Sequence, residues 1–151
     1  MPAEEHTEMP LPAGFFRRLA AMVYDSLLVA AVLFLVTIPF IAARGGEPVE
    51  IGDNLSYRIA LVIVIYAFFV GFWCHRGRTL GMQSWGLQLQ TEDGRIPSLR
   101  AATIRFFAAI LSLLPLGLGF FWQLVDAERL TWHDRLSKTR LVYYPRSKSP
   151  K

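Results

Sequence analysis

The sequence is poor in the residues that build disulfides, metal sites and nucleophilic centres. It has 151 residues with one cysteine, Cys74, and three histidines that are scattered along the chain. One cysteine excludes an internal disulfide, and the scatter gives no metal-ligand spacing, so no metal or cofactor is expected. Ser26 and Ser112 lie in apolar runs with no histidine at a similar depth, so we predict no enzyme. Internal repeats are also lacking.

Charge is missing from three long stretches, although 53% of all residues are hydrophobic and 19% are charged. The length allows one domain, and this apolar content exceeds ordinary soluble usage. The apolar runs are Phe15–Ala43, Ile59–Cys74 and Phe106–Val125. The net charge of +4 comes from basic residues that flank these runs, where lipid headgroups explain them better than nucleic acid does. The pattern predicts an integral membrane protein that contacts the bilayer and no nucleic acid.

The first run is the strongest sign of membrane insertion. From Leu19 to Ala43 it has twenty-five residues with one charge, Asp25, and about twenty apolar residues suffice to cross the hydrocarbon core as a helix. A signal peptide has a basic start and an apolar region of only about 7–15 residues. Here the acidic, proline-containing residues 1–14 come first, so we expect a disordered tail followed by an uncleaved span.

Asp25 is an expensive residue at this position. Insertion scales put an aspartate at the centre of a spanning helix at roughly 2.5–3.5 kcal/mol unfavourable. Either Asp25 reaches back to the near interface, or it faces other helices and there pairs or exchanges a proton. In the second case its partner is a hydroxyl, an arginine or water, and Tyr66 and Arg105 are candidates by depth.

The second run is short and the third is interrupted. Ile59–Cys74 has sixteen uncharged residues and spans if Arg58 extends outward and Trp73 lies at the interface. Phe106–Val125 has no charge, but a proline and two glycines break its middle. We therefore predict an all-α membrane protein with three hydrophobic helices, the third broken at Pro115–Gly119.

The polar segments predict a small cytoplasmic loop and strand excursion from this helical fold. Leu87–Gln90 alternates apolar and polar residues, as in a strand, and Leu141–Tyr143 can form a second strand beside it. Ser98 is placed to cap a helix that leads into the third run. Thr131–Asp134 has the spacing of a capping box.

The basic residues predict how the chain is oriented. Two lysines or arginines precede the first run, two lie in the first loop, five in the middle segment and seven in the tail. The positive-inside rule then places the middle segment and the amino terminus in the cytoplasm. Three full spans would send the basic tail outside, against the rule. Either the third run is re-entrant or it is a kinked helix of spanning length; its length favours the kinked helix, and the side of the tail stays open.

Three charged residues form a candidate functional set: Arg18, Asp25 and Asp134. Arg18 and Asp25 share a helix face but lie about 10 Å apart along the axis, so no direct ion pair is expected between them. Asp134 follows the third run at interface height and can meet Arg18. Simpler explanations are a membrane anchor for Arg18 and a helix cap for Asp134. His133 is expected on the surface, because adjacent helical residues do not face each other.

Three stretches resemble the RDD family of membrane proteins. They are Phe15–Ala21 followed by Asp25, then Gly77–Met82 with Gly86-Leu87 and Asp93-Gly94, and Thr131–Thr139. The resemblance covers about residues 14–144. The family is named for one arginine and two aspartates, which fall on Arg18, Asp25 and Asp134.

The resemblance implies a mostly bacterial membrane protein whose molecular function is poorly defined, with cation/proton exchange proposed for some members. We accordingly expect a multi-pass protein of the bacterial cytoplasmic membrane, with an RDD-like domain at residues 15–144 and a disordered basic tail at residues 145–151. Three helices cannot enclose a pathway, so transport of ions or small solutes implies a homo-oligomer or a larger complex. The alternative is a structural or assembly partner of another membrane complex, in which the charged set fixes helix packing. The sequence names no substrate.

Overall fold

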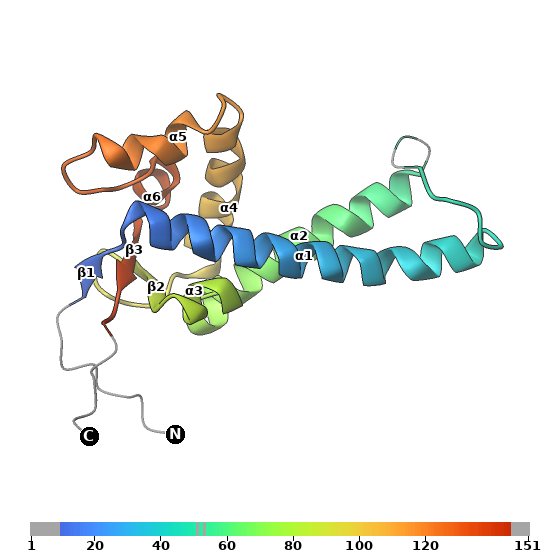
Figure 1. The fold of residues 1–151 in the computed structure, drawn as a ribbon, viewed down its shortest axis with the longest axis horizontal. Helices are drawn as coiled ribbons and strands as arrows, with labels where there is room; N and C mark the ends of the chain where they lie inside the picture. The colour runs from blue at the N-terminus through green and yellow to red at the C-terminus, as the bar shows by residue number, and fades with distance from the viewer. Residues whose placement is uncertain (1–9, 51, 53, 146–151) are drawn as a thin grey trace, which may run out of the picture.

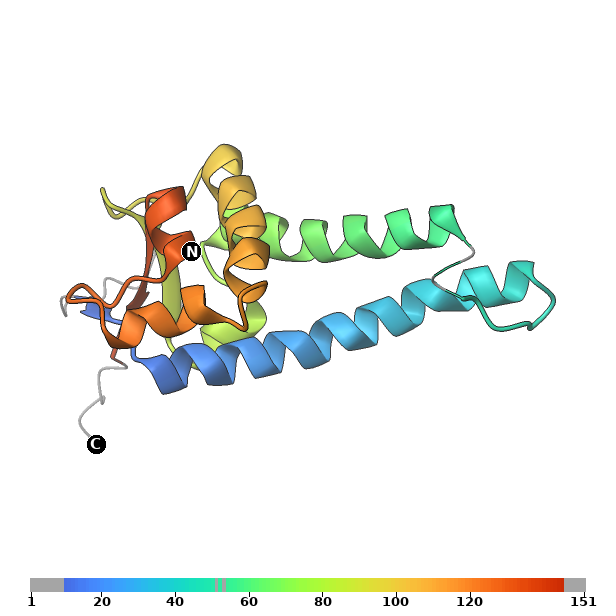
Figure 2. The same ribbon diagram turned by 90° about the horizontal axis from the view of Figure 1, so that it is seen from above.

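Two long antiparallel helices extend from a small mixed head in the computed structural model, which describes residues 10–50, 52 and 54–145 (Figures 1 and 2). They are α1 (Phe15–Ala43) and α2 (Leu55–Arg76). Both are long and apolar enough to cross a membrane, with mean hydropathies of 2.6 and 2.1. In an apolar segment of 18 residues within each helix, only 6% and 11% of the segment is buried inside the chain. The outer faces of both helices therefore require an apolar surrounding.

Hydrogen bonds of polar side chains hold the α1–α2 hairpin together near its connecting loop. Asn54 caps α2 by accepting a hydrogen bond from the Tyr57 backbone N–H at 3.0 Å. The Tyr57 hydroxyl lies 2.8 Å from the hydroxyl of Thr37 on α1. The rings of Tyr57 and Phe40 are 5.1 Å apart between centroids. The loop end of the hairpin is thereby fixed although few of its side chains are buried.

The head contains the remaining elements. They are β1 (Leu11–Pro12), α3 (Leu80–Ser84), β2 (Leu87–Thr91), α4 (Leu99–Leu113), α5 (Leu118–Phe121), the 3-10 helix η1 (Trp122–Leu124), α6 (Trp132–Ser137) and β3 (Thr139–Tyr143). The strands form one antiparallel sheet in the order β1-β3-β2. The hydrophobic core of the head includes Leu87, Leu89 and Leu141 of the sheet, which pack with Trp73, Met82 and Phe106.

The predicted strand excursion is confirmed, because Leu89 of β2 pairs with Leu141 of β3. The fold is therefore mostly helical but not all-α. Leu11 and Pro12 also join the sheet, so the chain is already ordered within the segment that was expected to be a disordered tail, residues 1–14. Residues 1–9 and 146–151 lie outside the described part of the chain, and with them most of both expected tails.

The third apolar run contains the predicted break. Ser98 caps α4 as expected, accepting from the Ala101 backbone N–H at 3.3 Å. After Leu113 the chain bends by 107° into α5 and η1. Leu116 and Gly117 have φ values of 54° and 77° there, which no helix continues through. The run thus forms α4 followed by the short helices α5 and η1, and it is a broken span or a re-entrant element.

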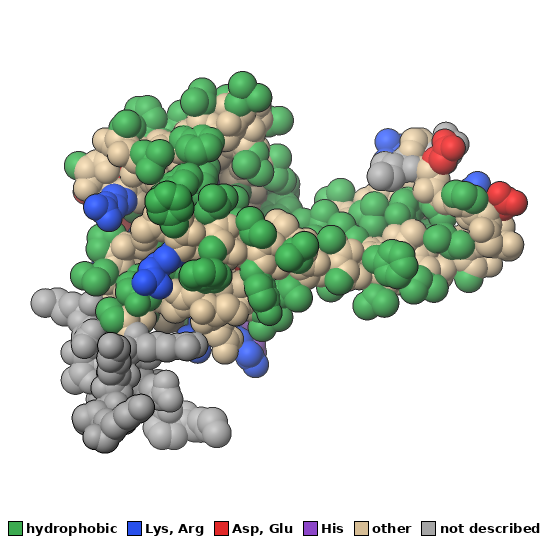
Figure 3. Space-filling model, in the orientation of Figure 1, with side chains coloured by type: hydrophobic (Ala, Val, Ile, Leu, Met, Phe, Trp, Pro, Cys, Tyr) green, Lys and Arg blue, Asp and Glu red, His purple; other side chains and the backbone are tan. Residues whose placement is uncertain are grey.

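The charges are separated along the long axis of the molecule. On the face shown in Figure 3, apolar side chains cover the hairpin, while charged side chains lie at the α1–α2 loop and around the head. This distribution fits a hydrocarbon layer between two polar surfaces.

Gly81 lets α3 pack tightly against α1. A Cβ added to Gly81 would lie 2.8 Å from Cγ of Asp25 and still closer to the Ala21 carbonyl oxygen. Both obstacles belong to α1, and one is backbone, so neither can move aside cheaply. The close approach positions the α3 backbone beside the Asp25 carboxylate.

We predict that Gly81→Ala lowers the free energy of unfolding by about 1–3 kcal/mol, the usual cost of overpacking. The matched control is Gly71→Ala in α2, where an added Cβ meets no atom within 4 Å. Because alanine favours helix over glycine, the control should be neutral or slightly stabilising. Unfolding in detergent followed by circular dichroism measures both variants, and equal stability of the two would contradict this packing.

Candidate functional site

Asp134 is buried at the amino end of α6, where it closes a capping box. Thr131 Oγ1 accepts a hydrogen bond from the Asp134 backbone N–H at 3.2 Å, and Asp134 Oδ2 accepts one from the Thr131 backbone N–H at 3.0 Å. The capping box predicted from the sequence is thus present. The Asp134 carboxylate is only 1% exposed, so its charge needs further partners.

Arg18 on α1 supplies the first of these partners. Its Nη1 donates to Asp134 Oδ2 at 2.7 Å. Its other nitrogens donate to the carbonyl oxygens of Ala13 at 3.2 Å and Arg129 at 3.1 Å. The contact expected between Arg18 and Asp134 is present, and Arg18 is 3% exposed rather than a simple surface anchor.

Arg105 on α4 supplies the second partner. Its Nη1 donates to Asp134 Oδ1 at 2.5 Å and to the Thr139 hydroxyl at 2.9 Å. The expectation that Arg105 meets Asp25 is wrong, because the bend after α4 and the capped start of α6 bring Asp134 to Arg105 instead. One carboxylate between two guanidinium groups therefore joins α1, α4, α6 and β3; we call Arg18, Arg105 and Asp134 the charge cluster.

The charge cluster carries one excess positive charge. Burial alone would raise the pKa of Asp134, but the guanidinium groups of Arg105 and Arg18 overcome it and hold that pKa well below its usual range. Burial and the charge of Arg105 lower the pKa of His133 to about 3, so its imidazole is neutral near pH 7. The expectation of a surface histidine is wrong: His133 lines a cavity.

Asp25 lies on α1 and is held by α3. Its Oδ2 accepts a hydrogen bond from the Thr79 hydroxyl at 2.5 Å, and its Oδ1 accepts one from the Gly81 backbone N–H at 2.9 Å. Thr79 Oγ1 also caps α3 by accepting from the Met82 N–H. A hydroxyl partner was expected, but Tyr66 was the wrong candidate, since its hydroxyl contacts Thr103 at 2.7 Å. Asp25 is 3% exposed and is therefore held inside the protein.

The two buried carboxylates differ in charge compensation. Asp134 has two arginine partners, whereas among residues 10–50, 52 and 54–145 no cationic group forms a salt bridge with Asp25. Arg18 and Asp25 do not pair with each other, as the spacing along α1 predicts. In the same described ranges no cluster of three His, Cys, Asp or Glu side chains is arranged to hold a metal ion.

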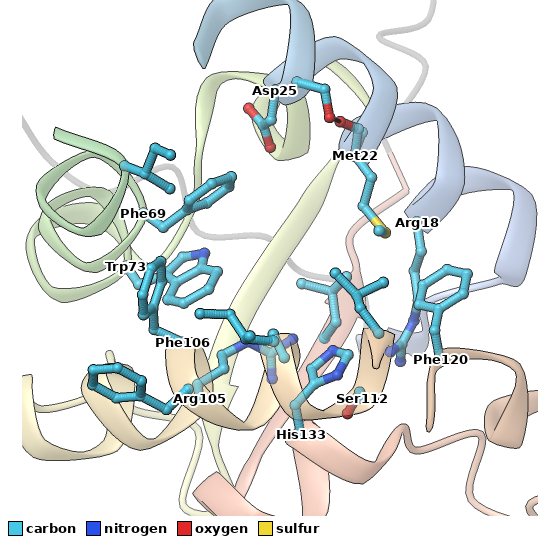
Figure 4. A pocket seen from close by; sticks show the side chains of 18 of the residues that line it. Arg18, Met22, Asp25, Phe69, Trp73, Arg105, Phe106, Ser112, Phe120 and His133 are labelled. Carbon is cyan, nitrogen blue, oxygen red and sulfur yellow. Dashed lines mark hydrogen bonds between the residues drawn. The ribbon is translucent and has the colours of Figure 1, made fainter. Parts of the chain in front are cut away.

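A cavity of about 490 Å³ connects the two sites (Figure 4). It lies between α1, α2 and α4, and most of its lining is apolar. Its charged or titratable lining residues are Arg18, Asp25, Arg105 and His133. In Figure 4 Asp25 lies at one end, while Arg105 and His133 lie at the other.

We predict that Asp134→Asn lowers the free energy of unfolding by about 3–5 kcal/mol, because it leaves two buried guanidinium groups without an anion. Glu128→Gln, which removes an exposed carboxylate of the same region, is the control and should change little. Chemical unfolding in detergent at neutral pH measures both. An Asp134→Asn protein as stable as the control would show that the charge cluster does not hold the head together.

In Asp134→Asn the free energy of unfolding should depend less on pH in the acid range than it does in the wild type. Since the pKa of Asp134 is depressed on folding, its stabilisation is complete above the unfolded value, about 3.9, and is lost as pH falls from there towards the folded-state value.

The comparisons with known proteins identify the family. The sequence profile of the RDD family matches residues 12–138. The chain is 30% identical over 138 residues to "Uncharacterized protein YckC" of Bacillus subtilis (strain 168), covering 87% of this chain and 85% of that protein. It is 28% identical over 151 residues to "Uncharacterized protein YxaI" of the same organism, covering 89% and 99%. No solved structure matches. The chain therefore belongs to the RDD family, whose members are membrane proteins.

Proposed function

We propose that this membrane protein takes part in the transport of ions or small solutes, by cation/proton exchange, and that Asp25 binds the exchanged proton or cation. The observation that carries the proposal is a buried carboxylate on a membrane helix, at the wall of a cavity, with no salt-bridge partner among the described residues. Ionisable groups within membrane segments are costly and are functional candidates by default.

Asp25 suits exchange better than Asp134 does. The Asp134 oxygens accept from two arginines and one backbone N–H, so protonating that carboxylate would disrupt three stabilising bonds. Among the described residues, the Asp25 oxygens accept from two neutral donors, the Thr79 hydroxyl and the Gly81 N–H. A proton or a cation at Asp25 therefore balances a charge that has no salt-bridge partner in the described ranges of the chain.

The sheet supports a topology with two crossings. β1 precedes α1, β2 follows α2, and β3 follows the third run, yet β1 and β2 both pair with β3. A three-stranded sheet of hydrogen-bonded neighbours lies on one side of the bilayer. In the proposed topology α1 and α2 cross, and α4 with α5 and η1 is re-entrant. The basic middle segment then places the amino terminus and the tail in the cytoplasm of a bacterial cell, with no conflict with the positive-inside rule.

Transport also requires more than one chain. Two crossing helices and a re-entrant element cannot enclose a pathway, and only 6% of the apolar window of α1 is buried within the chain. We therefore propose a homo-oligomer or a larger membrane complex whose subunits meet along the hairpin.

A second function is favoured by the charge cluster. All three of its residues bond to other parts of the same chain and join four elements. This arrangement supports the alternative of a structural or assembly partner of another membrane complex, in which the arginine and aspartate residues fix the shape of a docking subunit.

We expect Asp25→Asn to abolish exchange without unfolding the protein. Asparagine keeps the shape, its Oδ1 can accept from the Gly81 N–H, and its Nδ2 can donate to Thr79 Oγ1, so only the charge is lost. Purified protein in liposomes is assayed for proton movement driven by a cation gradient, and the variant should fall to the level of empty liposomes.

Glu47→Gln, in the exposed loop between α1 and α2, is the matched control and should exchange normally. Normal exchange by Asp25→Asn would overturn the proposed role of Asp25. Loss of the Asp25→Asn protein from the membrane, with no exchange by the wild type, would favour the assembly function instead.

The topology predicts which positions face outward. Single cysteines at Glu47→Cys, Asp93→Cys and Arg140→Cys are made in a Cys74→Ala background, and intact cells receive a membrane-impermeant maleimide. Only position 47 should be labelled, while positions 93 and 140 should react only after permeabilisation. Labelling of position 140 together with 47 would require a third crossing.

A further inference from the structure

Three buried nitrogen atoms that have no hydrogen-bond partner within the described part of the chain belong to residues that line the same cavity. They are Trp73 Nε1 on α2, Arg105 Nε on α4 and His133 Nδ1 on α6. Native proteins pair the great majority of buried polar groups, and the N–H groups of Trp73 and Arg105 can only donate, so they point to an external acceptor. His133 Nδ1 can donate to the same acceptor in the tautomer that carries its proton on that nitrogen. In Figure 4 the Arg105 guanidinium lies next to the His133 imidazole.

The charge at this end of the cavity selects the kind of acceptor. Arg18 and Arg105 share the single carboxylate of Asp134, which leaves one positive charge in excess. His133 is neutral and adds none, because its pKa is lowered to about 3. Asp25 lies at the far end, where its oxygens accept from Thr79 and Gly81. A negatively charged group on the three nitrogens would balance the excess.

The remainder of the cavity is suited to a hydrocarbon chain. Its volume of about 490 Å³ is typical of ligand sites, and its wall is mainly aliphatic and aromatic. Several lining side chains are also on the outer surface of the helices, with exposed fractions of 41% to 60%: Met22, Val62, Phe107 and Leu113. These positions lie on helices of the apolar layer, so the cavity opens sideways to the acyl chains of the bilayer.

We propose that the cavity binds an anionic membrane amphiphile, with one acyl chain between α1, α2 and α4 and its carboxylate or phosphate on Trp73, Arg105 and His133. A neutral lipid leaves the excess charge unbalanced, and a small inorganic anion leaves the apolar wall unfilled. The anionic group occupies the end of the cavity opposite Asp25, and the binding assay does not depend on the proposed exchange function.

The experiment measures binding of tritiated oleate to the purified protein in a nonionic detergent. Saturable binding is expected, with displacement by unlabelled oleate but not by oleyl alcohol, which has the same chain without the charge, or by inorganic phosphate. Dioleoyl phosphatidylglycerol as a competitor separates the two sources: stronger displacement than by oleate identifies a phospholipid, and weaker displacement identifies a free fatty acid. Absence of saturable binding by both anionic lipids, or equal displacement by oleyl alcohol, overturns the proposal.

Two variants localise the site. Trp73→Phe removes one N–H donor but keeps a ring in place, and it should weaken oleate binding about tenfold, the value of one hydrogen bond to a charged group. Trp85→Phe is the matched control, since Trp85 is 42% exposed and outside the cavity lining, and it should bind as the wild type does. Ala109→Phe fills the cavity and should abolish binding.

If Ala109→Phe fails to fold, the comparison of Trp73→Phe with Trp85→Phe decides alone. Equal affinity of these two tryptophan variants overturns the assignment of the anion to this end of the cavity. Because the assay contains no ion gradient, its outcome is separate from that of the exchange assay on Asp25.

Discussion

The structure depends on one carboxylate shared by two arginines. Asp134 bonds to Arg18 at 2.7 Å and to Arg105 at 2.5 Å, and all three side chains are at most 4% exposed. A buried ion pair gains little over apolar packing, but a buried charge that loses its partner is strongly destabilising. The first helix, the re-entrant or broken third run and the carboxyl-terminal strand are therefore tied into one arrangement by electrostatic necessity rather than by a large apolar core.

This constraint explains how a small head positions two long helices that bury little of their surface. Arg18 lies one turn into α1 and also bonds to the Ala13 carbonyl next to β1, so the sheet and the start of α1 share one anchor. Two turns further along, Asp25 receives α3 through Thr79 and Gly81. Because both anchors are on the same face of α1, they fix its rotation about its own axis, and its opposite face is left to lipid or to another subunit.

The sequence predicts the local features well and the distant pairings less well. The apolar runs, the break near Pro115 and the Thr131–Asp134 capping box all follow from patterns within a few residues. The pairing of β2 with β3 is a distant contact that the sequence also predicts, because both segments have strand patterns. Ordering by depth predicted the contact of Arg18 with Asp134 but misassigned Arg105. Depth along a straight helix loses its meaning once the run turns by 107°. The sequence did contain a signal for Thr79, the partner of Asp25. Thr79 is a hydroxyl residue at the start of a helix, and Gly81 follows it two residues later.

The two acidic residues of the family pattern thus have different environments, and this difference supports the roles proposed for them. Asp134 is kept ionised by two positive charges, and any change in its charge state threatens the fold. Asp25 has neutral donors alone and faces the cavity, so its surroundings tolerate either charge state without breaking a salt bridge. Under the proposed exchange function, Asp134 stays ionised and keeps the shape of the protein, while Asp25 changes its occupancy.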